Sequence, residues 1–420
     1  MEMGTNKFDI HVYAHWQGMD DALKMGVLSA HYAKGRKSFS FEYDKTWLKV
    51  HAGKTIDPDL HFFSGLQYPS VKENFGFVFD NMPDTWGRTL MKRRNSQLAK
   101  ERGEQALALH EIDFLLGVYD ESRMGALRFK TEENGAFLDN NKQFSTPPWA
   151  SVRELQHASL MLENENESEE DEKKWLNMLI VPGSSLGGAR PKANLLDENK
   201  ELWIAKFPSK NDTIDKAAWE YVAYQLAKLA GIAMAECRIE KLNHHQHTFF
   251  TKRFDREKTE RIHFASAMTM TGRNEEMLKT QPASYLHIVD FVQNNTAKVD
   301  VNLHQLWRRM AFNIAISNTD DHLRNHGFLL HPQGWMLSPA YDLNPSIDKD
   351  HLSLNIDLEN SELDIEIAKS VGAFFRLTMP DMDEIISEIN SAISKWETIA
   401  KEIGISRNEI QLMSAAFRKL

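Results

Sequence analysis

The stretch that decides the fold is Ser317-Asn318-Thr319-Asp320-Asp321-His322-Leu323-Arg324-Asn325-His326-Gly327-Phe328, and Tyr341-Asp342-Leu343 follows it. Phosphoryl transfer from ATP needs a carboxylate that orients the attacking hydroxyl, and it needs oxygen ligands that hold magnesium against the phosphates. Magnesium usually takes only one or two carboxylates from a protein and completes its shell with water and phosphate. This spacing therefore predicts Asp320 as the base and Asn325 and Asp342 as magnesium ligands.

The flanking residues place this stretch between a helix and a hairpin. Residues 327–330 and 335–337 read as two short strands around a turn at Pro332-Gln333-Gly334. Such a hairpin could bring Asp342 back beside Asn325. The alternative is that the polar residues only cap turns, as exposed Asn and Asp often do. Before the stretch, apolar residues with helical spacing predict a helix that ends near Ser317: Leu303, Leu306, Trp307, Met310, Ala311 and Ile314.

A second set of candidate residues lies upstream in Gly183-Ser184-Ser185-Leu186-Gly187-Gly188-Ala189-Arg190-Pro191-Lys192. Because glycine has no side chain, its backbone can approach a phosphate closely and bind it through amide groups. The segment is therefore a candidate phosphate-binding loop. The alternative is that Gly187-Gly188 forms an ordinary turn.

Lys206 stands inside the apolar run 202–207, which reads as a buried strand. A lysine in such a strand is rare unless it is paired. We expect Glu220 as its partner, on a helix that begins at Asp215 and ends at Gly231. The alternative is a lysine at a strand edge with its ammonium group in solvent. The predicted apolar stripe of the helix comprises Trp219, Val222, Ala223, Leu226 and Leu229.

A glycine loop, a strand lysine, a helix glutamate and the later Asp and Asn cluster occur here in the order found in protein kinases. In these residues the chain resembles the HipA-like serine/threonine kinases, the toxin partners of type II toxin-antitoxin pairs. The resemblance covers nearly the whole chain. The chain lacks the G-x-G-x-x-G, His-Arg-Asp and Asp-Phe-Gly motifs of conventional kinases, which is the form expected in this family. The resemblance also rests on residues 188–192, 251–256 and 81–88.

The resemblance implies roles for individual residues. Asp320 would be the catalytic aspartate, Asn325 and Asp342 the magnesium ligands, and Lys206 the lysine that contacts phosphate. The nucleotide would also contact Gly187, Gly188, Ala189 and Lys192 of the loop, and Lys252, Phe254 and Asp255 at the adenine and ribose edge.

Several members of this family phosphorylate a serine of their own glycine-containing loop. The matching residue is Ser185, and Ser184 beside it is the alternative. A phosphoserine adds roughly 1.5 to 2 negative charges close to the expected phosphates of ATP, so we expect it to displace the loop and inhibit the enzyme.

The pattern along the chain predicts an α+β protein with a two-lobed, kinase-like fold. A small N-terminal α/β domain is expected at residues 1–145, because residues 9–13 and 39–43 alternate as half-buried strands do. Residues 146–258 would form the N-lobe with the phosphate loop. Residues 259–420 would form a mostly helical C-lobe. The acidic run 163–172 is expected to be a mobile, solvated loop.

Composition restricts the class of protein. The 420 residues carry 50 Lys and Arg against 60 Asp and Glu, a net charge of −10, which argues against a chain that mainly coats nucleic acid. The basic run Lys92-Arg93-Arg94 is interpreted as a solvated helix face, with DNA or partner contact as the alternative. A single cysteine, Cys237, and the absence of a long apolar run predict a cytoplasmic protein that is not bound to membranes.

Histidines are frequent, but their spacing does not favour a metal site. His244-His245-Gln246-His247 lies between two strand-like segments and is interpreted as a polar hairpin turn, because it lacks the ligand spacing of common zinc sites. His322 and His326 flank the predicted catalytic loop. They could order Asp320 or Asn325 through hydrogen bonds.

The resemblance implies ATP and Mg²⁺ as cofactors, a protein substrate connected with translation, and a small helix-turn-helix antitoxin of HipB type as partner, through which the chain would associate with DNA indirectly. Two other functions stay open. A small-molecule phosphotransferase of the aminoglycoside or choline kinase kind shares the Asp, Asn and later Asp. A catalytically silent co-repressor would bind the antitoxin alone.

Overall fold

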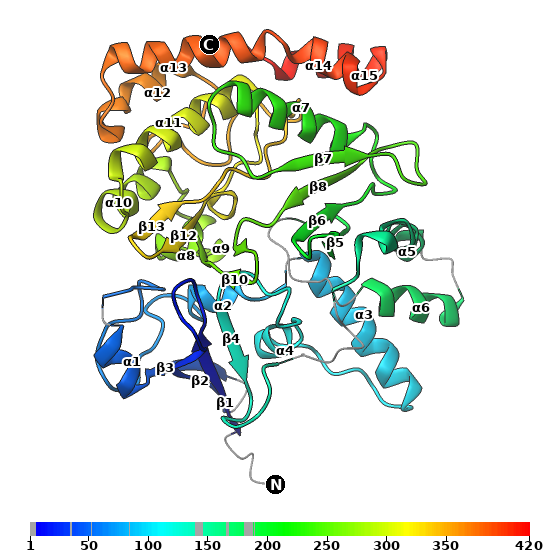
Figure 1. Ribbon diagram of the computed structural model, residues 1–420, viewed down its shortest axis with the longest axis vertical. Coiled ribbons are helices and arrows are strands. Elements are labelled where there is room, and N and C mark those ends of the chain that lie inside the picture. Colours follow the sequence, from blue (N-terminus) through cyan, green and yellow to red (C-terminus); the bar gives the residue numbers. More distant parts are fainter. Residues whose placement is uncertain are drawn as a thin grey trace. The chain divides into compact units, whose positions relative to one another are not determined.

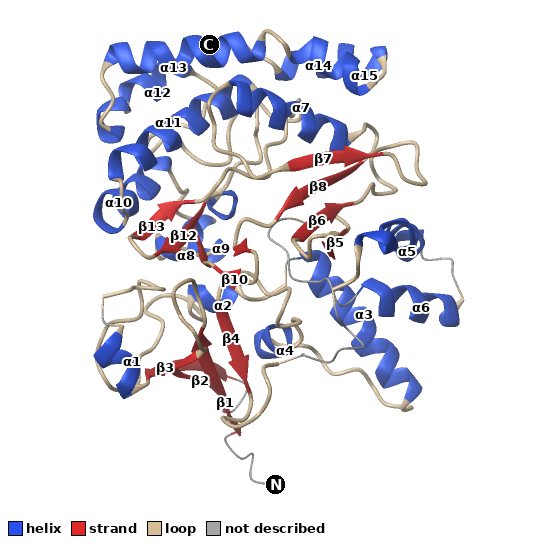
Figure 2. Cartoon of the chain, viewed as in Figure 1, coloured by secondary structure: helices blue, strands red, loops and turns tan. Residues whose placement is uncertain are grey.

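The computed structural model covers residues 1–420 and describes residues 6–33, 36–51, 53–83, 85–138, 146–164, 168–179, 188 and 190–420. The chain forms two compact units. Unit 1 comprises residues 1–204, 255–274 and 330–332, and unit 2 comprises residues 205–254, 275–329 and 333–420. Figure 1 follows the chain by colour, and Figure 2 distinguishes its helices from its strands. The domain boundaries that the sequence predicts after residues 145 and 258 stay a prediction.

Unit 1 begins with an antiparallel sheet of strand order β3-β2-β1-β4. Its register pairs Ile10 with Leu28 and Val12 with Phe129, and all four side chains are buried on one face. At Gly26 a β-carbon would lie 2.3 Å from the carbonyl oxygen of Glu42, so this close approach of two strands requires glycine. The predicted strands at 9–13 and 39–43 are confirmed. The strands are β1 (Asn6–Ala14), β2 (Leu23–Ala33), β3 (Arg36–Tyr43) and β4 (Leu127–Lys130).

Unit 1 also contains several helices. They are α1 (Lys45–Val50), α2 (Gly76–Asp80), α3 (Thr85–Glu101), α4 (Glu111–Leu116), α5 (Val152–Asn164), α6 (Glu169–Leu179) and α8 (Ala267–Met270), with a 3-10 turn at Trp149–Ser151. The short strands β9 (Arg256–Glu257) and β10 (Glu260–Arg261) pair as a hairpin.

The prediction of a loop across the acidic run 163–172 was wrong at both ends, because residues 163–164 end α5 and residues 169–172 form the first turn of α6. Two effects stabilise a helix here. Acidic side chains favour the positive end of the helix dipole, and the hydroxyl of Ser168 accepts a hydrogen bond from the backbone N–H of Asp171 at 3.2 Å. Further along, Leu176 and Leu179 are buried, and α6 contacts α5.

Two further sheets have the strand orders β5-β6-β8-β7 and β11-β12-β13. Their strands are β5 (Lys192–Leu196), β6 (Leu202–Lys206), β7 (Cys237–Glu240), β8 (Thr248–Lys252), β11 (His263–Ser266), β12 (Gly327–His331) and β13 (Gly334–Leu337). The predicted strand at 202–207 and the predicted hairpin around Pro332-Gln333-Gly334 are confirmed by β6, β12 and β13.

Unit 2 is mostly helical. In Figure 1 its C-terminal helices, coloured orange to red, lie along α11 and α7, and α13 contacts both. Trp307 on α11 is buried, and its indole N–H donates to the carbonyl oxygen of Ala368 at 2.9 Å. The helices are α7 (Lys216–Leu229), α9 (Glu275–Leu278), α10 (Tyr285–Asn295), α11 (Val299–Ala315), α12 (Ile365–Ser370), α13 (Met379–Ile393), α14 (Trp396–Ile403) and α15 (Arg407–Met413), with 3-10 turns η3 (Leu323–Asn325), η4 (Gly372–Phe375) and η5 (Ser414–Ala416).

Helix α7 begins and ends as the sequence predicts. Asp215 is its N-cap, because the carboxylate accepts a hydrogen bond from the backbone N–H of Ala218 at 3.2 Å. The chain leaves the helix through Gly231, whose φ is +72°. One member of the predicted apolar stripe was wrong. Leu229 is 50% exposed, because it is the last residue of the helix and the chain turns away beyond it.

Two features considered from composition were the single cysteine and the lack of a long apolar run. Cys237 donates to the carbonyl oxygen of Ala235 at 3.4 Å, and burial raises the pKa of its thiol to about 12, as in a packed cysteine. Among the helices that the structure describes, none combines the length and the apolar composition needed to cross a membrane.

Candidate active site

The stretch 317–328 forms a compact loop between α11 and β12. The helix ends at Ala315, and Ser317 then takes a left-handed conformation with φ +49°. Asp320 is exposed, whereas Asp321 next to it is buried. The side-chain amide of Asn325 donates from Nδ2 to the backbone carbonyl of Asp320 at 3.1 Å. The loop thereby joins the two predicted site residues Asp320 and Asn325.

The β12–β13 hairpin carries the chain back to this loop. The hydroxyl of Tyr341 donates to the carbonyl oxygen of Arg324 at 2.6 Å, so Asp342 follows a residue that contacts the loop directly. Asp342 has φ +59°, in the left-handed region that residues other than glycine rarely adopt. Such a conformation persists only where the surrounding structure enforces it, and it is common at functional sites.

Lys206, at the end of β6, lies between two carboxylates. Its Nζ is 2.6 Å from Oε1 of Glu220 on α7 and 2.7 Å from Oδ1 of Asp342. The side chains of Lys206 and Glu220 are 12% and 8% exposed, so their ion pair is well shielded, whereas Asp342 is 24% exposed. Burial by itself lowers the pKa of Lys206, but Asp342 and Glu220 outweigh burial and hold the pKa above its ordinary value. The lysine therefore stays charged and joins α7 to the Asp342 segment.

Asn325 supplies a further acceptor. Its Oδ1 is buried and has no hydrogen-bond partner among the described residues. An unsatisfied buried carbonyl is costly, so its presence suggests a missing partner. Oδ1 of Asn325 and the carboxylate of Asp342 are the hard oxygen ligands that Mg²⁺ takes, and they match the small number that a protein normally provides. These residues fit a magnesium ion.

The phosphate-loop residues are only partly described. Ser184, Ser185, Gly187 and Ala189 lie outside the described residues. Gly188, in unit 1, has φ +52°, which favours glycine. Lys192 begins β5, is buried and donates from Nζ to the carbonyl oxygen of Gly188 at 3.1 Å. This contact ties the lysine to the glycine segment.

The three residues expected at the adenine and ribose edge have different surroundings. Lys252 ends β8 and is half-buried. The ring of Phe254 contacts the ring of Tyr341, with centroids 5.5 Å apart. Asp255 belongs to unit 1 and is fully buried there, where Oδ2 accepts from the backbone N–H of Gly125 at 2.7 Å and from Nη1 of Arg256 at 2.6 Å. These contacts give Asp255 a structural role, and its contact with nucleotide stays a prediction.

A buried polar cluster lies next to the loop, and the sequence analysis named only His326 among its members. The partner of His326 is Asp321 and not Asp320 or Asn325. Oδ2 of Asp321 lies 3.0 Å from Nε2 of His326, and it accepts a short hydrogen bond from the hydroxyl of Tyr285 on α10. The hydroxyl of Tyr285 accepts in turn from Nδ2 of Asn313 on α11 at 3.0 Å. Burial raises the pKa of Asp321, but His326 and the hydrogen bonds outweigh burial and hold the pKa below its usual value. Asn313 shares the buried part of α11 with two other polar residues, Asn302 and Arg309, so the sequence did not single it out.

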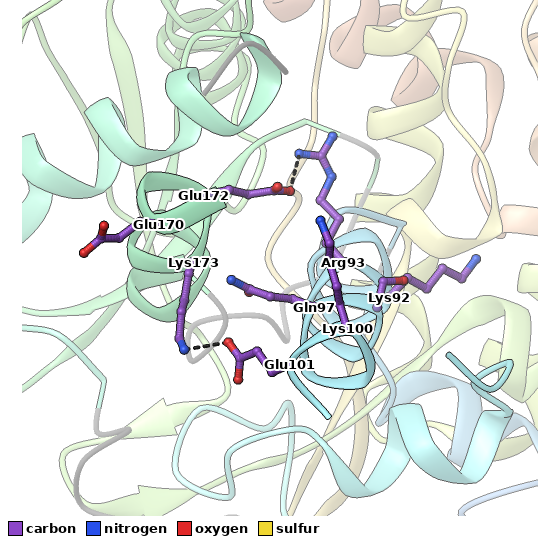
Figure 3. Close-up of a pocket in the computed structure, with 9 residues that line it drawn as sticks. Lys92, Arg93, Gln97, Lys100, Glu101, Glu170, Glu172 and Lys173 are labelled. Carbon is purple, nitrogen blue, oxygen red and sulfur yellow. Dashed lines mark hydrogen bonds and ion pairs between the residues drawn. The ribbon is translucent and has the colours of Figure 1, made fainter. Parts of the chain in front are cut away.

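Lys92 and Arg93 of the basic run on α3 line a pocket in unit 1, which Figure 3 shows. Its volume is about 590 Å³, and its walls come from α3 and α6. Charges of both signs meet there: Lys173 lies 2.5 Å from Glu101, and Arg93 lies 3.8 Å from Glu172. The pocket is thus a mixed-charge surface between two helices and not a uniformly basic face.

In the histidine run at residues 244–247, His247 is buried. Its Nδ1 lies 2.6 Å from Oδ2 of Asp215, the N-cap of α7. The run lies between β7 and β8, which pair in antiparallel fashion, so the predicted hairpin connection is confirmed.

Comparison with known proteins supplies the remaining observations. Residues 184–396, slightly more than half of the chain, match the protein family described as the HipA-like C-terminal domain. A curated Haemophilus influenzae protein described as a putative kinase is 26% identical over 182 residues, which are 38% of this chain and 52% of that protein. The chain therefore spans about half the length of this relative.

One solved structure shows the same fold. A chain in the complex of Shewanella oneidensis MR-1 HipA and HipB with operator DNA matches with a TM-score of 0.65 and 18% identity, over 97% of this chain and 94% of that one. The Helicobacter pylori proinflammatory kinase CtkA gives a TM-score of 0.41 and 15% identity, over 54% of this chain and 88% of that one, a value too low to add to the argument. The predicted mixed fold of helices and sheets is confirmed by the first of these matches.

Proposed function

This chain belongs to the family with a HipA-like C-terminal domain, and from that premise we propose that it is an ATP- and Mg²⁺-dependent serine/threonine protein kinase. The observation that carries the proposal is Lys206 held between Glu220 and Asp342, next to a loop that presents an exposed Asp320. A strand lysine paired with a helix glutamate, a metal-binding aspartate and a catalytic-loop aspartate and asparagine are the parts that kinases use.

Each residue has a role in the proposed reaction. Asp320 accepts the proton of a serine or threonine hydroxyl while the oxygen of that hydroxyl bonds to the γ-phosphorus. The bond from that phosphorus to the bridging oxygen breaks, and ADP leaves with the electron pair. Lys206 binds phosphate oxygens, and Glu220 keeps its ammonium group oriented. Asn325 and Asp342 would hold Mg²⁺, which supplies charge stabilisation for the transferred phosphoryl group when bound.

The loop and the pocket edge complete the proposed nucleotide site. Gly187, Gly188, Ala189 and Lys192 bind the phosphates, and Lys252, Phe254 and Asp255 contact the adenosine. The enzyme phosphorylates its own Ser185, or Ser184, and the added charge repels ATP phosphates and inhibits the enzyme.

A partner is part of the proposal. The fold match is to a protein solved together with HipB and operator DNA, which supports a HipB-like helix-turn-helix antitoxin as partner and an indirect association with DNA. The net charge of −10 suits a basic partner of that kind. The chain would act as the toxin of the pair, would work in the cytoplasm, and would inhibit growth by phosphorylating a protein connected with translation.

Intact-mass spectrometry tests the proposed chemistry. Purified protein is treated with phosphatase and then incubated with ATP and Mg²⁺, beside Asp320→Asn and Ser185→Ala variants. We expect one added phosphate in the unmodified protein, none in Asp320→Asn, and loss or relocation of the phosphate to Ser184 in Ser185→Ala. Nucleotide binding without any added phosphate would contradict autophosphorylation and favour a metabolite phosphotransferase or a silent co-repressor.

A further inference from the structure

The carboxylate of Asp321 occupies an unusual place. It directly follows the exposed Asp320, yet its side chain and that of His326 are each only 2% exposed. A charge at such a position is costly unless it is paired and hydrogen-bonded. Asp321 is both, through His326 Nε2 at 3.0 Å and the hydroxyl of Tyr285. A buried carboxylate that is costly to desolvate, and that is paired and hydrogen-bonded, thus directly follows the proposed catalytic base.

This contact closes the loop at two points. Asp320 directly precedes Asp321, and Asn325 directly precedes His326. The Asp321–His326 pair therefore holds together the two ends of the segment that carries Asp320 and Asn325. A second tie runs from Nδ2 of Asn325 to the carbonyl oxygen of Asp320 at 3.1 Å. With Nδ2 held, the orientation of the amide is fixed, and so is the position of the unpartnered Oδ1 of Asn325.

The cluster is anchored to rigid helices. Tyr285 lies in the first turn of α10, and Nδ2 of Asn313 on α11 donates to its hydroxyl at 3.0 Å. One helical turn earlier on α11, buried Arg309 donates from Nη2 to the carbonyl oxygen of Ser338 at 2.5 Å, in the segment that leads to Asp342. The same face of α11 therefore supports both segments that carry proposed magnesium ligands.

We propose that Asp321, together with His326 and Tyr285, positions the Asp320 carboxylate and the Asn325 amide oxygen for metal–nucleotide binding and phosphoryl transfer. This inference rests on the proposed kinase function and deepens it. None of the three touches substrate in the proposed reaction, so they are positioning residues and not catalytic ones. Partners that orient metal ligands in this way typically affect metal affinity or activity by about 10- to 100-fold when they are lost.

The test separates positioning from simple stabilisation. Asp321→Asn keeps the shape of the side chain but removes its charge, and Trp307→Phe is the matched control. That control removes a buried hydrogen bond as well, but one that joins α11 to α12 and does not involve the loop. For each variant we would measure the melting temperature, the affinity for Mn²⁺ in the presence of a non-hydrolysable ATP analogue, and kcat and KM for ATP.

Positioning predicts that Asp321→Asn weakens Mn²⁺ binding and lowers kcat, each by about 10- to 100-fold. The KM for ATP should rise together with the loss of Mn²⁺ affinity, because the metal and the nucleotide bind as one complex. Trp307→Phe should lower only the melting temperature. His326→Gln, which keeps a hydrogen-bond donor, should retain more activity than His326→Ala. Tyr285→Phe, which removes one hydroxyl, should show the same changes as Asp321→Asn but smaller ones. It replaces Asp321→Asn as the test variant if Asp321→Asn does not fold.

Two results would overturn the inference in distinguishable ways. If Asp321→Asn or Tyr285→Phe lowers the melting temperature as Trp307→Phe does while Mn²⁺ affinity and kcat stay unchanged, the cluster is structural and the kinase proposal survives. If the unmodified protein itself binds no Mn²⁺ with the analogue and transfers no phosphate, the proposed function fails and the positioning role fails with it.

Discussion

At the scale of single residues, Lys206 combines a structural and a functional role. It pairs with two carboxylates, so its replacement removes an ion-pair partner from both Glu220 and Asp342. We expect Lys206→Met to cost about 3 kcal/mol of stability and to abolish phosphate transfer, whereas Lys206→Arg keeps the charge and most of the stability. Thermal denaturation together with the mass assay checks this. A Lys206→Met protein as stable as the parent would show that the ion pairs contribute little.

For Asn325 we expect a small loss of stability together with a clear change in the requirement for Mg²⁺. Its Oδ1 has no partner among the described residues, and its Nδ2 makes one hydrogen bond. Asn325→Ala therefore loses only about 1 kcal/mol of stability. Because the variant lacks a proposed magnesium ligand, we expect the Mg²⁺ concentration for half-maximal activity to rise at least about 10-fold. A titration of activity with Mg²⁺ measures this, and an unchanged requirement for Mg²⁺ would remove Asn325 from the set of proposed ligands.

Residue type and spacing were enough to select Asp320, Asn325, Asp342 and the Lys206–Glu220 pair as candidates. They were not enough to distinguish the two adjacent aspartates by environment, because Asp320 is exposed and Asp321 is buried. That difference depends on Tyr285 and His326, and the contact with Tyr285 arises only when α10 packs against α11. Tertiary contacts of this kind leave no fixed spacing in the sequence.

At the scale of elements, helical and strand periodicity predicted α7, α11, β6 and the β12–β13 hairpin because each has a clear apolar face or an apolar run between turn residues. The acidic start of α6 was missed for a physical reason. Its four acidic residues suggest repulsion in an isolated peptide, but they lie at the end of a helix where negative charge is favourable. Burial of Leu176 and Leu179 then stabilises the helix.

The N-terminus of α7 offers a test of how an element positions a site residue. Asp215 caps the helix that carries Glu220, and it pairs with buried His247. Asp215→Asn keeps the cap but loses the charge, so we expect a cost of about 1 kcal/mol. Asp215→Ala loses both and should cost about 2 to 3 kcal/mol. Melting temperatures of the two variants measure the difference, with the N-cap variant Thr378→Ala on α13 as control.

The Asp215–His247 pair should also make the stability of the protein depend on pH. Burial raises the pKa of Asp215, but hydrogen bonds from His247 and the helix backbone outweigh burial and lower the pKa below its ordinary value. A carboxyl group with a lowered pKa contributes stability above its unfolded pKa of about 3.9 and loses that contribution as the pH falls through the folded pKa. The stability difference between the parent and Asp215→Asn should therefore be full at neutral pH and vanish in acid. A difference that grows below pH 4 would contradict this assignment.

At the scale of the whole molecule, unit 2 holds Lys206, Glu220, Asp320, Asn325 and Asp342 together. A ligand that binds only the folded state stabilises it by about 2.7 kcal/mol at 100 times its dissociation constant. We therefore expect a non-hydrolysable ATP analogue with Mg²⁺ to raise the melting temperature and to slow amide exchange in α7, the 317–328 loop and the β12–β13 hairpin.

The magnesium-dependent part of this stabilisation locates the ion. It should disappear with a chelator, and it should be greatly reduced in two variants, because Asn325→Ala lacks a proposed oxygen ligand and Asp342→Asn lacks the negative charge of the carboxylate ligand. A control variant in the α3–α6 pocket, Lys173→Ala, should respond like the parent, since its partner Glu101 belongs to unit 1. Slower exchange confined to α3 and α6, with unit 2 unaffected, would place the nucleotide in that pocket and would contradict the proposed roles of Lys206, Asn325 and Asp342.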